Sequence, residues 1–210
     1  MYTLYGFKGS GSASVEMALR VIGADFRIVN AATWEPSSAI EELRTVNPLG
    51  QIPTLVLPDG SVMSESAAIL IHLGLASEPG LLLPANDAAR AQAIRGLVYI
   101  PANCYSCITI LDYPERFTTE KDKEALDSVR AGTRERLHKH WDIFADTFKP
   151  SPFLNGAAPG ALDFFAAVVS KWAGSRPHLK EHRPGFFDLL ERIEAHPSVA
   201  DVFNAHWEKK

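Results

Sequence analysis

Glycine and serine residues gather between a short aromatic segment and the first helical pattern of this chain. The segment Gly9-Ser10-Gly11-Ser12 follows Tyr2–Gly6, whose aromatic residues and terminal glycine are typical of a buried strand. Apolar residues then recur at helical spacing between positions 15 and 22. Because a helix N-terminus carries free N–H groups and the positive end of the helix dipole, it favours an anion. The segment therefore predicts an anion-binding turn, with a plain tight turn as the alternative.

Two further polar segments stand next to predicted element ends. In Gln51-Ile52-Pro53-Thr54, a proline directly precedes an apolar β run, as an edge-strand starter or a cis turn residue. In Ser64-Glu65-Ser66, hydroxyl groups and a carboxylate open an apolar helix, which also suits an ordinary helix cap. The first glycine segment is no P-loop, and Ser14 replaces the third glycine of a dinucleotide-binding fingerprint.

The elements that position these residues follow an α/β order in the first half of the chain. A strand–helix–strand unit reaching position 29 precedes a short helix over 37–46. Two β runs, 54–57 and 61–63, flank the turn Pro58-Asp59-Gly60 and predict an antiparallel hairpin, after which a helix runs to Leu75. This order predicts a small α/β domain with a mixed sheet.

The second half of the chain shows only helical patterns. Helices are predicted over 86–98, which Pro101 ends or kinks, and over 121–148, 163–172, 184–196 and 198–207. Glu78-Pro79-Gly80 is the most linker-like segment. We therefore expect an α/β domain over 1–78 and an all-α domain over 86–210, joined by a linker over 79–85.

Composition narrows the class of protein. The chain has 210 residues, 46% of them hydrophobic, with a net charge of −4, which is typical of an ordinary globular protein and argues against a nucleic-acid partner. No segment approaches the ~18 uninterrupted apolar residues of a membrane span. The N-terminus shows no signal-peptide pattern, and two cysteines, Cys104 and Cys107, are too few for a disulfide framework. We expect a cytoplasmic protein with no membrane partner and no metal.

The order of these motifs, more than any one of them, is informative. Asn47-Pro48-Leu49-Gly50-Gln51-Ile52-Pro53-Thr54-Leu55 precedes the hairpin, and Met63-Ser64-Glu65-Ser66-Ala67-Ala68-Ile69 follows it. In this order, and with the helical second half, essentially the whole chain resembles the glutathione S-transferase family. The resemblance implies a thioredoxin-like βαβ(α)ββα N-terminal domain followed by a helical-bundle C-terminal domain.

The resemblance also implies a glutathione site. Pro53 corresponds to the cis-proline of the family, which lets the main chain of Ile52 pair with the cysteinyl part of glutathione. Glu65 and Ser66 are expected to hold the γ-glutamyl end, in agreement with the preference of a carboxylate for a helix N-terminus and of an ammonium group for a carboxylate. Gly11 and Gln51 complete the expected binding residues.

The residue that activates the thiol of glutathione is expected in the first glycine segment. Family members use Tyr, Ser or Cys near the end of the first strand, and the Cys of one bacterial class would fall on Gly11. We expect Ser12 to be the activating residue, since it stands at the predicted helix start, with Ser10 as the second candidate. Tyr5 lies within the strand and is expected in the core.

The activity implied by the resemblance is transfer of glutathione to small hydrophobic electrophiles, as in detoxification, by a homodimer. A non-catalytic binding or regulatory module and a glutathione-dependent peroxidase or reductase are the alternatives. The absence of cysteine from positions 9–12 argues against a mechanism through a protein thiol. Candidate residues for the electrophile pocket are Tyr99, Asn103, Tyr105, Tyr113 and Trp172.

Overall fold

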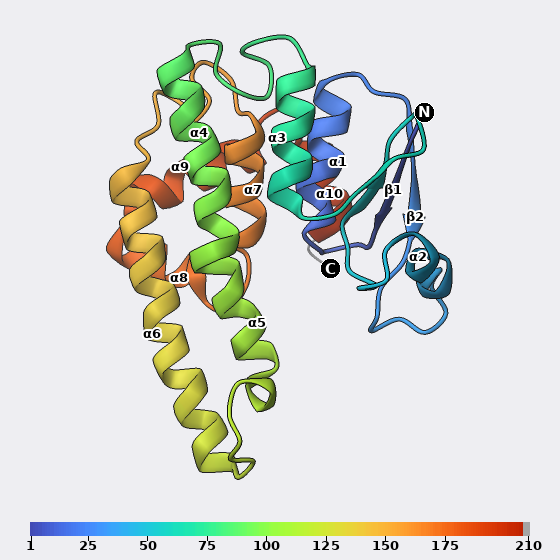
Figure 1. Ribbon diagram of the computed structural model, residues 1–210. Coiled ribbons are helices and arrows are strands. Elements are labelled where there is room, and N and C mark those ends of the chain that lie inside the picture. The colour runs from blue at the N-terminus through green and yellow to red at the C-terminus, as the bar shows by residue number, and fades with distance from the viewer. Residues whose placement is uncertain (208–210) are drawn as a thin grey trace.

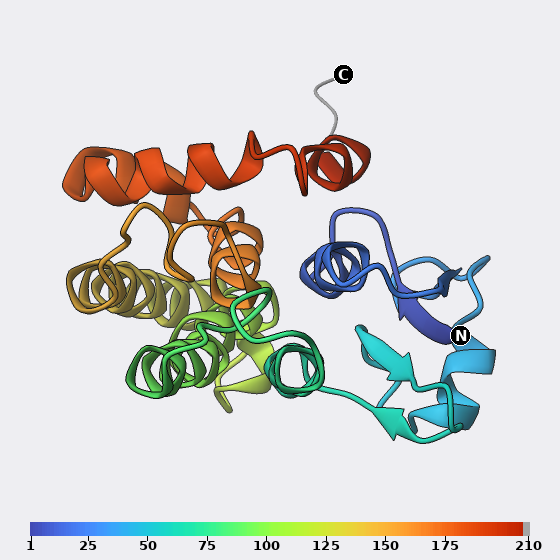
Figure 2. The same ribbon diagram turned by 90° about the horizontal axis from the view of Figure 1, so that it is seen from above.

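The structure, a computed structural model, describes residues 1–207. Its first half forms a four-stranded sheet in the order β2-β1-β3-β4, in which β1 pairs in parallel with β2 and antiparallel with β3. Helices α1 and α3 cover the face of the sheet that looks toward the second half, and α2 lies on the opposite side (Figures 1 and 2). The elements of this half are β1 (Tyr2–Gly6), α1 (Ser12–Val21), β2 (Phe26–Asn30), α2 (Ile40–Val46), β3 (Thr54–Val56), β4 (Val62–Met63) and α3 (Ser66–Ala76).

This arrangement confirms the thioredoxin-like fold expected for the first half. The short helix begins at Ile40 and not at position 37, and the β3–β4 hairpin is shorter than the two apolar runs suggested. Helix α1 lies between the sheet and the helices of the second half, so nearly all of its residues are buried, Glu16 among them. The sheet contributes Leu4 and Leu55 to the shared hydrophobic core.

Every regular element of the second half is a helix in the described residues, which confirms the expected all-α class. Helix α8 has no counterpart among the helices predicted from the sequence. The elements are α4 (Asp87–Tyr99), the π-helical segment η1 (Ile100–Tyr105), α5 (Ser106–Asp112), the short 3-10 segment η2 (Pro114–Arg116), α6 (Lys123–Thr147), α7 (Ala161–Val169), α8 (Ser175–His182), α9 (Pro184–Glu194) and α10 (Ala200–Trp207).

Pro101 falls in the π-helical segment between α4 and α5. Since proline has no N–H group to donate to the preceding turn, the helix widens there and continues. The continuous run Asp87–Asp112 is long and apolar enough to cross a membrane by length and composition alone. Its buried residues, Leu97 and Cys104 among them, belong to the hydrophobic core and pack toward α6 and α7, as expected for a core helix.

Helix α7 lies at the centre of the molecule, and all nine of its residues are buried. It packs against α1 and α3 of the first half and against α4 and α9 of the second. The carboxylate of Asp163, in its first turn, accepts hydrogen bonds from three main-chain N–H groups: Leu154 at 2.8 Å, Asn155 at 3.0 Å and Gly160 at 3.0 Å. One side chain thus closes the loop that leads into the central helix.

Candidate glutathione site

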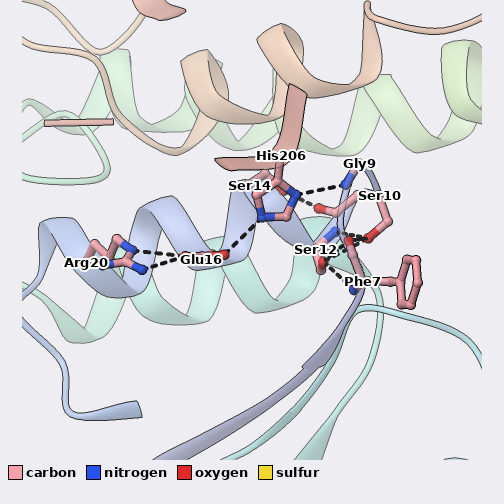
Figure 3. A network of polar contacts seen from close by, with 9 residues as sticks. Phe7, Gly9, Ser10, Ser12, Ser14, Glu16, Arg20 and His206 are labelled. Atoms are coloured by element: carbon pink, nitrogen blue, oxygen red, sulfur yellow. Dashed lines mark hydrogen bonds and ion pairs between the residues drawn. The ribbon is translucent and has the colours of Figure 1, made fainter. Parts of the chain in front are cut away.

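The turn between β1 and α1 is held by a pair of buried serine hydroxyls (Figure 3). Ser10 Oγ donates to the carbonyl of Phe7 at 2.7 Å and lies 2.8 Å from Ser12 Oγ, which accepts from the Phe7 N–H at 3.2 Å. Ser10 is 7% exposed and Ser12 is 2% exposed. Both serines of the predicted turn therefore lie together at the end of β1.

The protons of the two hydroxyls can be assigned from this geometry. Each hydroxyl carries one proton, and that of Ser10 is used on the Phe7 carbonyl, so the proton of Ser12 faces Ser10 Oγ at 2.8 Å and the Phe7 carbonyl at 3.4 Å. Helix α1 begins at Ser12, and its first main-chain N–H groups make only long bonds of 3.2 to 3.3 Å, to Ser10 and Gly11. The positive end of the helix dipole therefore sits at a turn that two hydroxyl groups line.

The Gln51–Thr54 turn lies beside the end of β1, because Tyr5 pairs with Thr54 across the sheet. The Ile52–Pro53 peptide bond is cis, as the resemblance implies. Asn47 Nδ2 donates to Thr54 Oγ1 at 2.9 Å, and Thr54 Oγ1 donates to the Gln51 carbonyl at 2.8 Å. Asn47 and Thr54 thus fix the turn from inside; the sequence placed both in the motif without assigning them this role.

Glu65 lies at the start of α3 with a φ of 65°, a conformation that a residue with a side chain seldom adopts. Such backbone costs of order 1–3 kcal/mol and is concentrated at ligand-binding sites. Glu65 is exposed, whereas Ser66, the first residue of α3, is 9% exposed. The α3 N-terminus therefore presents a carboxylate, a hydroxyl and main-chain N–H groups.

Tyr105 brings a third hydroxyl group to the β1–α1 turn. Its oxygen lies 3.0 Å from the position that a Cβ atom on Gly11 would take, so any larger residue at position 11 would crowd this hydroxyl. Burial, together with the charge of Asp112, raises the pKa of Tyr105 to about 12, so the hydroxyl keeps its proton at neutral pH. The ring of Trp172 lies 5.5 Å from that of Tyr105, between centroids. The sequence had assigned Tyr105 only to the electrophile pocket.

The other pocket candidates have their contacts elsewhere. Tyr99 packs against Phe144 and donates to the His140 carbonyl at 3.1 Å, both on α6. Asn103 donates to the Tyr99 carbonyl at 3.1 Å. Tyr113 is 39% exposed, with the guanidinium of Arg116 over its ring. The structure therefore brings Tyr105 and Trp172 together near Gly11 and gives no such contact for the other three.

A thioredoxin-like sheet with a cis-proline turn, joined to an all-helical second half, is the architecture of the glutathione S-transferase fold. The model of the glutathione S-transferase N-terminal domain matches residues 12–75. Escherichia coli (strain K12) has an uncharacterized GST-like protein, YncG, that is 35% identical over 96% of this chain and 97% of its own length. The glutathione S-transferase GstA of Escherichia coli O157:H7 is 26% identical over 94% of each chain.

Solved structures show the same architecture. A glutathione transferase homologue from Sulfitobacter with bound glutathione superposes with a TM-score of 0.79, at 20% identity over 97% of each chain. The glutathione S-transferase from Xylella fastidiosa gives a TM-score of 0.83, at 21% identity over 98% of each chain. The chain belongs to the glutathione S-transferase family.

Proposed function

We propose that the protein is a cytoplasmic glutathione transferase that conjugates glutathione to small hydrophobic electrophiles and uses a serine hydroxyl to stabilise the thiolate. The observation that carries the proposal is the Ser10–Ser12 hydroxyl pair at the N-terminus of α1, beside the cis-Pro53 turn. The family membership and the glutathione bound to the Sulfitobacter homologue support glutathione as the co-substrate.

Glutathione binding is proposed along the edge where β1, β3 and α3 meet. The cis bond at Pro53 leaves the main chain of Ile52 accessible, and this main chain, with Gln51 beside it, pairs with the cysteinyl part of glutathione. Glu65 binds the ammonium group of the γ-glutamyl end, and Ser66 binds its carboxylate with help from the α3 dipole. This arrangement directs the cysteinyl sulfur toward Gly11 and the serine pair.

The stabilisation needed for the thiolate is within reach of this turn. Lowering a thiol pKa from ~8.5 to about 6.5 requires roughly 2.7 kcal/mol. A hydrogen bond to a charged sulfur contributes ~1.5–3 kcal/mol, and a helix N-terminus contributes ~0.3–2 kcal/mol. The proposed site therefore needs no general base: the thiol proton passes to bulk water, and the thiolate forms a C–S bond with the electrophile as a leaving group departs or a double bond opens.

A change of hydrogen-bond partner within the serine pair makes a hydroxyl donor available to the sulfur. The Ser12 O–H, which stays within the turn in the structure, turns toward the sulfur, so that a hydrogen bond between neutral groups is replaced by a charge-assisted one. The Phe7 N–H continues to hold Ser12 Oγ in place during this exchange. Ser10 is the second candidate, since its own proton is held by the Phe7 carbonyl.

The electrophile is proposed to bind against Tyr105 and Trp172, with Tyr99, Asn103 and Tyr113 as further candidates for the pocket. The aromatic pair next to Gly11 offers an apolar wall beside the sulfur. We further propose that the chain divides into the domains 1–78 and 86–210 and that it acts as a homodimer.

The proposal is tested by the ultraviolet absorbance of the glutathione thiolate as a function of pH, with and without the protein. We expect the bound thiol to titrate about two pH units below the free thiol. A bound thiol that titrates like the free one contradicts thiolate activation. That outcome supports a glutathione-binding module, a second function that the engagement of both serine protons inside the turn favours.

A further inference from the structure

The last turn of α10 reaches back to the β1–α1 turn through His206 (Figure 3). The Gly9 N–H donates to His206 Nδ1 at 3.1 Å, across 197 positions of the sequence. The other ring nitrogen, Nε2, lies 3.0 Å from Glu16 Oε2 on α1. One imidazole therefore joins the end of the helical half to both the turn and the helix that carry Ser10 and Ser12.

The contacts of His206 define its tautomer. A main-chain N–H only donates, so Nδ1 carries no proton, and Nε2 carries the proton and donates to Glu16. Burial opposes ionisation of Glu16, but the hydrogen bonds from His206 and Arg20 and the charge of Arg20 outweigh it and lower the pKa of this carboxyl. Glu16 is therefore a charged acceptor that holds the ring with Nδ1 facing the turn.

Gly9 has a backbone conformation that favours glycine, and it lies against the end of α10. Its φ of 72° lies in the left-handed region, and a Cβ atom there would lie 3.7 Å from the His206 carbonyl oxygen and 3.9 Å from Trp207 Nε1. The side chain of His206 is only 9% exposed. The turn is thus held on two sides, by Phe7 through the serine pair and by α10 through Gly9.

We propose that His206 is a positioning residue for the thiolate site: by accepting the Gly9 N–H, it fixes the turn in which Ser10 and Ser12 meet the sulfur. The chemical part of this proposal rests on the proposed function. In this role His206 acts on the turn through Gly9. Loss of the acceptor frees the turn, and the hydroxyl that stabilises the thiolate then loses its fixed direction.

Two variants of His206 distinguish the contact of Nδ1 with Gly9 from the contact of Nε2 with Glu16. Asn in place of His206 puts an amide oxygen where Nδ1 was and keeps the Gly9 acceptor, whereas Gln reaches to the position of Nε2 and keeps only the Glu16 contact. The measurements are the exchange rate of the Gly9 amide proton by NMR and the pH titration of bound glutathione thiol, on the full chain. His182→Gln, an exposed histidine on α8, is the matched control.

For His206→Gln we expect Gly9 exchange to rise about ten-fold and kcat to fall about three- to ten-fold, the size of one lost hydrogen bond. The bound thiol then titrates closer to its free value, while His206→Asn and His182→Gln stay near wild type. Equal Gly9 exchange in the Asn and Gln variants overturns the positioning contact. Faster Gly9 exchange in the Gln variant with an unchanged thiol titration overturns its role in the chemistry.

Failure of the proposed function gives a different result. If wild-type protein leaves the thiol titration of glutathione unshifted, thiolate activation is wrong, and with it the chemical role given to His206. The Gly9 exchange rates still decide whether the imidazole holds the turn. Thermal unfolding of each variant shows whether a smaller folded population accounts for a change in Gly9 exchange or in the thiol titration.

Discussion

The N-termini of α1 and α7 are both buried and polar, yet they are built in opposite ways. At α7, one carboxylate, that of Asp163, takes three main-chain N–H groups in bonds of 2.8 to 3.0 Å. At α1, Gly11 stands at the cap position and brings no side chain, and the first N–H groups make long bonds within the turn. One helix end is closed by a carboxylate of the protein, and the other is bonded only to neutral groups and is the end at which we propose that the thiolate binds.

The difference separates a fold-stabilising site from a proposed chemical one. A charge that is fully satisfied inside the chain stabilises a single backbone arrangement and offers nothing to a ligand. Neutral hydroxyls that bond to each other can exchange partners at low cost when a thiolate arrives. Variants at the two helix ends are therefore expected to change different measurements.

The largest effect is expected for Asp163→Ala. Removing the carboxylate leaves one buried and two partly buried N–H groups without this acceptor, which lowers the free energy of unfolding by roughly 3–5 kcal/mol. Urea denaturation measures this loss, and Asp188→Ala, at an exposed position on α9, is the control. The glutathione thiol titration of the remaining folded protein stays as in wild type. A loss below about 1 kcal/mol contradicts the role given to this helix end.

Ser12→Ala is expected to have the next largest effect, in kinetics. Loss of a hydrogen bond to a charged sulfur lowers kcat/KM about 10- to 100-fold and moves the bound thiol titration toward the free value. Glutathione binding, measured by calorimetry, is spared. Ser77→Ala serves as the control. Like Ser10, Ser77 donates its hydroxyl to the carbonyl three residues earlier, but it lies at the end of α3. Full activity in Ser12→Ala with loss in Ser10→Ala assigns the role to Ser10.

Tyr105→Phe is expected to give the smallest effect. The variant removes only the hydroxyl beside Gly11, a neutral donor kept protonated by its raised pKa of about 12. We expect kcat/KM to fall about three- to ten-fold, with the ring contact to Trp172 preserved. Tyr5→Phe, which loses a hydroxyl bond to Glu42 on α2, is the control. Loss of activity as large as in Ser12→Ala makes Tyr105 the principal donor to sulfur.

The helices and strands were predictable from the sequence where hydrophobic periodicity and the positions of proline and glycine determine them. The order of strands and helices in the first half and five of the helices in the second half follow from periodicity and from proline and glycine positions. Helix α8 was missed because its segment contains Pro177 and buries a single large apolar side chain, Leu179. Tertiary contacts hold it instead: Arg176 pairs with Glu194 on α9, and His178 lies 3.0 Å from Asp142 on α6.

The candidate site was predictable to the same extent. Ser10, Ser12, Ile52 and Glu65 lie at the ends of predicted elements, where loops meet helices and strands, so their place could be inferred. The approach of Tyr105 to Gly11 and of His206 to Gly9 depends on how the two halves pack. Sequence spacing carries no signal for either contact, since each joins residues about a hundred or more positions apart.

The contact between Gly9 and His206 also has a consequence during protein synthesis. The ribosome makes the chain from the N-terminus at about 5–20 residues per second, so His206 follows Gly9 by roughly 10–40 s. Once β4 has been made, the sheet and α1 can form while α10 is still missing, and α1 then lacks the part of its cover that α10 provides. The face of α1 that meets the helical half is therefore among the last surfaces of the first half to be covered during synthesis.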